Sequence, residues 1–144
     1  GRRLLILASE DIGLANPNAL LLAQACFDSI RVIGNPESRI ILSQTVIYLA
    51  NSPKSNSAYL AINEALAFVE KTGNLPVPLH LRNAPTKLMK EMNYGVEYKY
   101  PHNYPGHWVA QNYMPELDVN PVFYQAAQNS AEEKMRQKNS KKED

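Results

Sequence analysis

The sequence predicts an all-α protein organised as a helical bundle. Apolar residues recur at helical spacing in four successive stretches before Gly73, and no stretch has a convincing strand pattern. Asn16-Pro17 and Asn35-Pro36 stand where helices would start, and Gly34 and Gly73 stand where helices would end. The 144 residues are the length of one ordinary domain. A chain of this length buries about two-thirds of its unfolded surface.

The first expected helix lies in the apolar run Arg2–Ala8 and places two acids, Glu10 and Asp11, in its last turn. The helix dipole disfavours acids at this end. We therefore expect these carboxylates to have a cationic partner, for which Arg82 and Lys54 are the candidates.

The second and third expected helices, from Asn16 to Gly34 and from Asn35 to Pro53, are unusually poor in charge. Residues 12–50 carry only four charged side chains, whereas an average segment of this length would hold about ten. Such helices either form the centre of the monomer's own core or bury part of their surface against identical copies. We predict self-association, through an interface that includes Leu20, Leu21, Phe27, Ile41, Ile47 and Tyr48.

The fourth expected helix begins at Ser55 or Asn56 and ends near Thr72. A proline-rich extended stretch follows, and Asn83 and Pro85 then predict a short fifth helix. Its apolar side chains are expected to face the body of the domain: Leu88, Met89 and Met92.

Arg82 and Lys87 flank the start of this fifth helix, where exposed amides favour an anion. One interpretation is a phosphate or carboxylate site. The other is a capped surface helix whose cations pair with acids elsewhere in the chain: Glu10, Asp11 or Glu64.

An irregular segment rich in tyrosine and proline follows Tyr94. We expect an ordered wrap fixed by its aromatic rings, and the alternative is that the rings stack on unpaired bases. The mixed-charge end, residues 132–144, is compatible with a frayed helix or a disordered tail.

Composition limits the function classes. The chain has 44% hydrophobic and 20% charged residues and a net charge of +1, which is typical of a globular protein and not of one that coats nucleic acid. A single cysteine, Cys26, and the lack of any apolar run of about 18 residues predict a soluble protein of a reducing compartment, the cytoplasm.

Catalytic chemistry is not expected in this sequence. There is no phosphate-binding Gly-x-x-x-x-Gly-Lys-Ser/Thr motif, and Cys26 lies within an apolar helical run. His102 and His107 lack the further ligands of a zinc site, so no metal is expected. The alternative enzyme hypothesis, a hydrolase that uses His80 and Asp11, has no nucleophile motif to support it.

Four groups of residues resemble one known family: Glu10-Asp-Ile-Gly13, Pro53-Lys-Ser-Asn56, the eleven residues from His80 to Lys90, and Tyr94-Gly95 with Tyr98, Tyr100, Pro101 and His102. Together they are similar to the C-terminal region of the replication-associated recombination protein A (RarA/MgsA) family of AAA+ ATPases. The resemblance covers residues 1–117. In residues 118–144 it is looser, because Pro121–Gln125 stands where the family has Arg-Tyr-Tyr-x-Pro.

The resemblance implies a helical domain like the collar of clamp-loader subunits, which holds four subunits together. It also implies that ATP, magnesium and the Walker motifs belong to an N-terminal ATPase module absent from this chain. The parent protein would act at stalled replication forks, with DNA and single-strand-binding protein as partners. A polar junction would brace the collar, contact the ATPase module or bind an anion: Glu10, Asp11, Lys54, Arg82, Asn83, Lys87 and Lys90. We therefore expect a tetramerisation domain, with direct DNA binding by the Lys/Arg cluster as the alternative.

Overall fold

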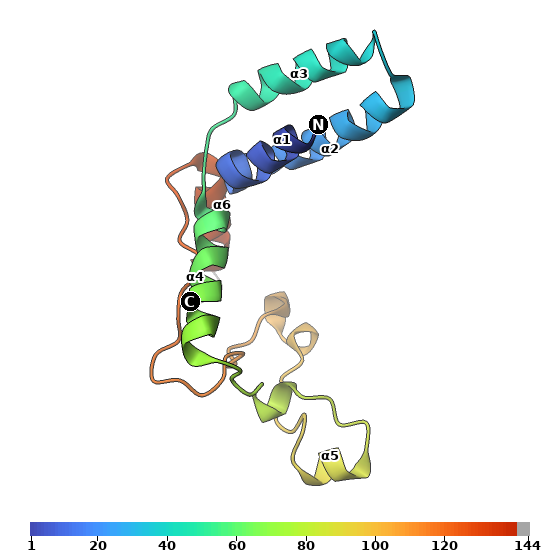
Figure 1. Ribbon diagram of the computed structural model, residues 1–144. Coiled ribbons are helices and arrows are strands. Elements are labelled where there is room, and N and C mark those ends of the chain that lie inside the picture. Colours follow the sequence, from blue (N-terminus) through green and yellow to red (C-terminus); the bar gives the residue numbers. More distant parts are fainter. Residues whose placement is uncertain (141–144) are drawn as a thin grey trace. The chain divides into compact units, whose positions relative to one another are not determined.

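The computed structural model describes residues 1–140 and confirms the all-α class. Within them there are six α-helices and no strand (Figure 1): α1 Arg2–Leu7, α2 Asn18–Ile33, α3 Ser38–Ala50, α4 Ser57–Thr72, α5 Lys87–Glu91 and α6 Ser130–Ser140. The chain forms two compact units. The first contains Gly1–Leu66 and the segment that starts at Phe123, and the second contains Ala67–Val122.

The first unit contains α1, α2, α3, the start of α4 and α6, and α2 packs against both α1 and α3 (Figure 1). α1 continues through a π-helical turn, Ala8–Ile12, and a 3-10 turn, Gly13–Ala15, before α2 begins. Ile12 and Ala8 are buried where this turn meets α2. The chain thus reverses direction inside the core of the unit.

The interior between α2 and α3 is made mainly of small side chains. α2 buries Ala19, Ala23 and Cys26, which are spaced four and three residues apart and share one narrow face. α3 buries Thr45 and Leu49, with Ser38 at its start, and the Thr45 hydroxyl donates to the Ile41 carbonyl oxygen at 2.9 Å. Each helix therefore hides only a narrow face within the unit, and most of its larger apolar side chains lie elsewhere.

Two helix ends follow the prediction, whereas one helix start does not. Gly34 ends α2 and Gly73 follows α4, both with positive φ. Asn16 does not cap α2. Its side-chain amide donates instead to the hydroxyl oxygens of Tyr48 at 2.9 Å and Ser52 at 3.1 Å, so a tertiary contact with α3 replaces the local cap.

The fifth helix differs from the prediction in its cap, its length and its orientation. Thr86 caps it, because its hydroxyl accepts a hydrogen bond from the Met89 amide at 3.2 Å. The helix spans only five residues. Leu88 is 65% exposed and Met92 lies beyond the helix end, also exposed, so the expected inward position is wrong for these two residues. Met89, the third, is half-buried. A helix of little more than one turn cannot present a continuous face to a core.

The second unit is ordered by hydrogen bonds as well as by short helical turns. Those turns are Leu79–Leu81, Pro101–Asn103 and Pro105–His107. The Gln111 side chain bridges to the backbone of Lys99, donating to its carbonyl oxygen at 2.7 Å and accepting from its amide at 3.2 Å. No helix in residues 1–140 has the length and apolar content needed to cross a bilayer.

Two short motifs that are far apart in the sequence meet through their backbones in the first unit. The Ser55 amide donates to the Asp11 carbonyl oxygen at 2.8 Å. Gly13 has a φ of 49°, and a Cβ atom at this position would lie 2.8 Å from the Ser55 carbonyl oxygen. Glycine is therefore required at position 13 by both conformation and space.

The C-terminal segment is fixed to the start of α4 by a fully buried carboxylate. Glu132 of α6 is 0% exposed and accepts hydrogen bonds from the Ser57 hydroxyl at 2.5 Å and the Tyr124 hydroxyl at 2.9 Å. The Asn129 side chain also donates to it, and the Asn129 Oδ1 atom accepts from the Glu132 amide at 2.9 Å.

The hydrogen bonds of Glu132 decide its charge state. Burial raises the pKa of this carboxyl, but hydrogen bonds from Ser57, Ser55, Asn129 and Tyr124 outweigh burial and lower the pKa to about 2 from its ordinary 4.5. The group is thus a buried anion that is stabilised by neutral donors. Of residues 132–144, which were expected to be a frayed helix or a disordered tail, residues 132–140 belong to α6 and residues 141–144 lie outside the described residues.

We expect Gly13→Ala to destabilise the protein more than Gly34→Ala. Both glycines have positive φ, which costs a residue with a Cβ atom about 1–3 kcal/mol. A Cβ at Gly34 would meet open space, whereas a Cβ at Gly13 would displace Ser55, which adds about 1–3 kcal/mol. Urea unfolding followed by circular dichroism measures the difference. Equal losses for the two variants would show that the close approach to Ser55 is unimportant.

We also expect Glu132→Gln to lower the free energy of unfolding at neutral pH by about 2–3 kcal/mol, because an amide cannot accept all the hydrogen bonds that the carboxylate accepts. The folded-state pKa of Glu132, about 2, lies below its ordinary 4.5, so its contribution is complete above pH 4.5 and is lost as the pH falls towards 2.

The loss in the wild-type protein over that pH range should be roughly 3 kcal/mol from this group. The stability difference between wild type and Glu132→Gln should therefore narrow as the pH falls from 4.5 to 2. Glu64→Gln, which changes an exposed acid of α4, is the control and should leave the pH profile unchanged. A difference that stays constant with pH would contradict the buried anion.

Candidate functional site

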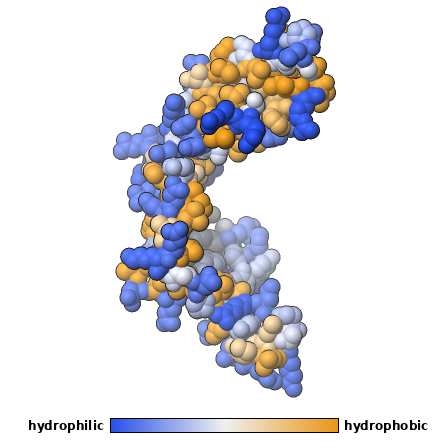
Figure 2. Space-filling model, viewed as in Figure 1, coloured by the Kyte–Doolittle hydropathy of each residue, from blue (hydrophilic) through white to orange (hydrophobic). Residues whose placement is uncertain are grey.

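Large apolar side chains lie on the surface of α2 and α3. Leu21 is 68%, Ile40 is 64% and Ile47 is 60% exposed. Figure 2 shows apolar side chains gathered at the surface over this part of the molecule. We call the following residues the apolar surface: Leu20, Leu21, Val32, Ile33, Ile40, Val46, Ile47 and Tyr48. Exposure on this scale is unusual for a soluble monomer and is typical of a protein interface.

The apolar surface is hollowed between its two helices. An open depression is lined by Asn18, Leu21, Leu22 and Ala25 of α2 and by Gln44 and Tyr48 of α3. Its lining carries no charged residue. Such a depression can receive an apolar side chain from another molecule.

The structure places the six predicted interface residues in two groups. Leu20, Leu21, Ile47 and Tyr48 are exposed. Phe27 and Ile41 are half-buried in the first unit. The Phe27 ring lies against Gly1, and the Arg31 guanidinium lies 5.9 Å from the centre of this ring.

Four residues of the apolar surface were missed by the sequence prediction: Val32, Ile33, Ile40 and Val46. The signal that could have identified them is the helical spacing of small residues in the same two helices. Ala19, Ala23 and Cys26 mark the buried face of α2, so the larger side chains on the other faces of that helix are exposed.

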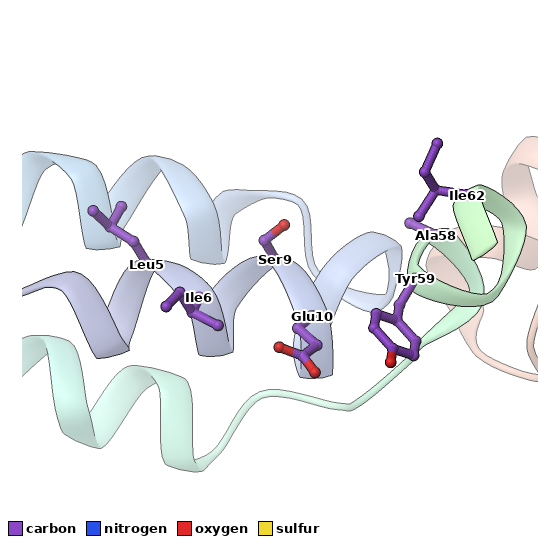
Figure 3. Close-up of a pocket in the computed structure, with 7 residues that line it drawn as sticks. All are labelled: Leu5, Ile6, Ser9, Glu10, Ala58, Tyr59 and Ile62. Carbon is purple, nitrogen blue, oxygen red and sulfur yellow. The ribbon is translucent and has the colours of Figure 1, made fainter. Parts of the chain in front are cut away.

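A second apolar groove lies between α1 and the start of α4, both in the first unit. Figure 3 shows its lining, in which Leu5, Ile6, Ser9 and Glu10 come from the N-terminal helical segment and Ala58, Tyr59 and Ile62 come from α4. Glu10 is the one acidic residue of this lining. Glu10, which the sequence analysis assigned to a polar junction, thus lines an apolar groove of the first unit.

The residues of the predicted polar junction fall into both units. Glu10, Asp11 and Lys54 belong to the first unit, whereas Arg82, Asn83, Lys87 and Lys90 belong to the second. Among residues 1–140 there are two ion pairs, Lys87–Glu91 at 4.0 Å and Arg136–Glu133 at 3.0 Å.

Within the first unit, Glu10 and Asp11 form no ion pair with Lys54 among the described residues. The Asp11 backbone carbonyl accepts a hydrogen bond from the Ser55 amide. In the second unit, Arg82 donates to neutral groups. The Lys87–Glu91 pair is fully exposed and contributes little to stability.

Arg82 is held in place by its neighbours in the second unit. Its Nε atom donates to the Val77 carbonyl oxygen at 2.7 Å and its Nη1 atom donates to the Tyr94 hydroxyl at 3.1 Å. The guanidinium carbon lies 5.0 Å from the centre of the Tyr94 ring. These contacts fix the direction of the side chain through hydrogen bonds and a cation–π interaction.

Arg82 lines a pocket that contains no acidic residue. We call it the polar pocket, and its main lining residues are His80, Arg82, Asn83, Gly95 and Tyr98, with Leu81 and Ala84 beside them. His80 and Asn83 were singled out from the sequence, but Tyr98 was not assigned to this site. Tyr98 is brought to it by the turn around Gly95.

No group of three or more potential metal ligands occurs in the described part of the chain. His102 and His107 lie close together, with ring centres 4.9 Å apart, and the Tyr100 ring lies 5.1 Å from that of His102. The hydrolase hypothesis pairs His80 with Asp11, and these two residues belong to different units. Within the second unit, the His80 Nε2 atom lies 2.7 Å from the Asn112 carbonyl oxygen.

Known proteins similar to this chain identify its family. A model of the family described as "MgsA AAA+ ATPase C terminal" matches residues 1–143. Replication-associated recombination protein A of Coxiella burnetii is 41% identical over 138 residues, which are 95% of this chain and 31% of that protein. The protein of the same name in Bacillus subtilis is 46% identical over 127 residues, 88% of this chain and 30% of that protein. ATPase WRNIP1 of Dictyostelium discoideum is 43% identical over 125 residues, 86% of this chain and 14% of that protein.

This chain spans less than a third of the length of these relatives. The matched family model describes a C-terminal region, so the chain is not itself the catalytic ATPase module. The match continues to residue 143, beyond the point at residue 117 where the likeness of the motifs weakens. Its motifs, its helical fold and this match together show that the chain belongs to the family of MgsA AAA+ ATPase C-terminal domains.

Proposed function

We propose that this chain is the tetramerisation domain of an AAA+ ATPase that acts in DNA replication and recombination at stalled forks. The observation that carries the proposal is the apolar surface of α2 and α3, which the first unit leaves open. In this proposal the helices form a collar like that of clamp-loader subunits, and the aromatic, proline-rich segment after Tyr94 wraps the domain.

The size of the apolar surface is sufficient for association. A fully buried Leu, Ile or Val side chain contributes about 1.5–3 kcal/mol. The apolar surface comprises eight residues that are about half exposed, and they can therefore gain roughly 8 kcal/mol from a partner. Association costs on the order of 4–15 kcal/mol in lost freedom. The two terms are comparable, so we expect assembly that depends on protein concentration.

A second copy of the chain is a suitable partner because the surface is both apolar and uncharged. Its hollow between α2 and α3 has no charged lining residue, so a partner side chain that enters it loses little hydration if it too is apolar. The exposed residues of the same surface supply such side chains. In a self-associated pair, one copy can supply the hollow and the other copy the apolar side chain that enters it.

The proposed assembly would act by raising the effective concentration of the ATPase modules of the parent protein around DNA. In this proposal, ATP and magnesium bind in the N-terminal module outside this chain. DNA and single-strand-binding protein are reached through the parent protein. The remaining residues of the predicted polar junction, such as Lys54 and Lys90, would then brace the collar or contact the ATPase module.

Direct DNA binding is the second candidate function. The observation in its favour is that Lys54 and Lys90 are exposed and take part in neither ion pair of residues 1–140. Binding through four phosphate contacts would give a slope of log affinity against log salt near −3.6, from about 0.9 per contact. An assembly domain has negligible affinity for DNA and keeps its oligomers at high salt.

We expect the 144-residue chain to form tetramers of about 65 kDa from copies of 16.2 kDa, and Ile47→Glu to convert them to monomers. A charge at this position would have to be buried without a partner. Size-exclusion chromatography with light scattering measures the mass across a range of concentrations. Leu21→Glu, on the other helix, should have the same effect.

Val119→Glu is the matched control, because Val119 is an apolar residue at least as exposed as Ile47 but lies in the second unit. It should leave the tetramer intact, since the proposed interface lies in α2 and α3. A wild-type chain that is monomeric at all concentrations would overturn the proposal. Tetramers that persist in both Ile47→Glu and Leu21→Glu would show that the interface lies elsewhere.

A further inference from the structure

We propose that the polar pocket of the second unit binds a phosphate group. The pocket has a volume of about 450 Å³ and is built from the segments around Arg82 and Gly95. Self-association does not require the polar pocket, and phosphate binding in the polar pocket does not require self-association. The pocket also gives a role to the segment His80–Lys90, which the apolar surface leaves unexplained.

The first argument is the state of Arg82. A guanidinium has five N–H donors. The described residues accept from two of its atoms, Nε and Nη1, and both acceptors, the Val77 carbonyl oxygen and the Tyr94 hydroxyl, are neutral. Arg82 is half-buried and forms no ion pair with a carboxylate of the second unit among the described residues. It is a positioned cation without an ion-pair partner in its unit, although Glu116 lines a neighbouring depression together with His80 and Arg82.

The second argument is the chemistry of the lining. No aspartate or glutamate lines the polar pocket, so no carboxylate of its lining repels an anion there. The Nε2 atom of His80 lies 2.7 Å from the Asn112 carbonyl oxygen. Because a carbonyl can only accept, Nε2 carries a proton and is the donor in this contact, which fixes the orientation of the ring at the pocket.

The third argument is the backbone that closes the pocket. Gly95 donates to the Leu79 carbonyl oxygen at 2.8 Å, and a Cβ atom at Gly95 would lie 3.2 Å from the Arg82 carbonyl oxygen. Gly95 has a φ of 73° and Glu97 has a φ of 66°. A glutamate in this conformation is strained, and strain of this kind is retained where a site needs a particular backbone path. The path ends at Tyr98, whose side chain joins the lining.

The geometry favours a phosphate over a carboxylate. A guanidinium binds either a carboxylate or a phosphate through a parallel pair of N–H donors. The Nε atom of Arg82 already donates to Val77, which removes one such pair for both anions, so the choice between them depends on the other donors of the pocket. The remaining donors belong to Arg82, to the Asn83 amide and to the Tyr98 hydroxyl. Donors that reach a site from separate parts of the chain suit a tetrahedral oxyanion with acceptors on several sides.

The experiment titrates the 15N-labelled chain with inorganic phosphate and follows the backbone amides by NMR at constant ionic strength. We expect saturable shifts confined to residues 80–84 and 95–98, with a dissociation constant on the order of 1 mM. Arg82→Gln should weaken binding at least about tenfold, because a charge-assisted hydrogen bond is lost. Acetate at the same concentration should bind more weakly than phosphate.

Two further variants separate binding from folding. Asn83 is exposed and lines the pocket, so Asn83→Ala should keep the fold and weaken phosphate binding by about threefold or more. Lys90→Gln removes an exposed cation of the same segment that does not line the pocket, and it should leave binding unchanged. An equal loss for Lys90→Gln and Asn83→Ala would mean general charge attraction and would overturn the proposal.

The source of the phosphate is tested by a deoxynucleoside 5′-monophosphate. If it shifts the same amides and binds more tightly than the inorganic ion, the pocket takes a nucleotide phosphate. If it shifts them and binds no more tightly, the pocket takes the phosphate group alone. No saturable shift with either probe up to about ten times the expected dissociation constant would overturn the site. Tetramer formation is measured independently, so its failure would not be confused with this result.

Discussion

The packing of α2 against its neighbours determines which apolar side chains of the first unit are buried and which remain exposed. The buried side chains of this helix are Ala19, Ala23 and Cys26, and small side chains of this kind cover little area. The larger apolar residues of the same helix, such as Leu21, therefore remain at the surface. In most proteins the large apolar side chains are among those most often buried. Here the arrangement is reversed, and the assembly proposed above would cover these exposed side chains.

The helices themselves could be predicted from local sequence because their limits are set by local chemistry. Gly34 and Gly73 have the positive φ that ends a helix, and no neighbour is needed to explain it. The starts of α2 and α5 could not be predicted in the same way. Asn16 has the right side chain to cap a helix, but Tyr48 and Ser52 compete for it from α3. At α5, the cap fell to Thr86 instead of Asn83.

In the candidate sites, too, features that depend on residues far apart in the sequence could not be predicted. The shortage of charge in α2 and α3 indicated an exposed apolar surface, since composition is a property of the segment itself. The role of Glu132 could not be predicted, because its partner Ser57 is 75 residues away in the sequence. An acid in a mixed-charge terminal segment has no local sign of burial. Arg82 was identified by its motif, but its neutral partners, Val77 and Tyr94, were not expected from charge alone.

The contact between Glu132 and Ser57 has a consequence for the order in which the protein folds. The first unit is discontinuous in sequence, because the segment from Phe123 belongs with Gly1–Leu66 and the second unit is inserted between them. During synthesis the ribosome must therefore deliver all of Ala67–Val122 before the first unit can be completed. Until then the Ser57 hydroxyl lacks the carboxylate that it binds in the native state. The contact between α6 and the start of α4 can therefore form only after the inserted unit has been synthesised.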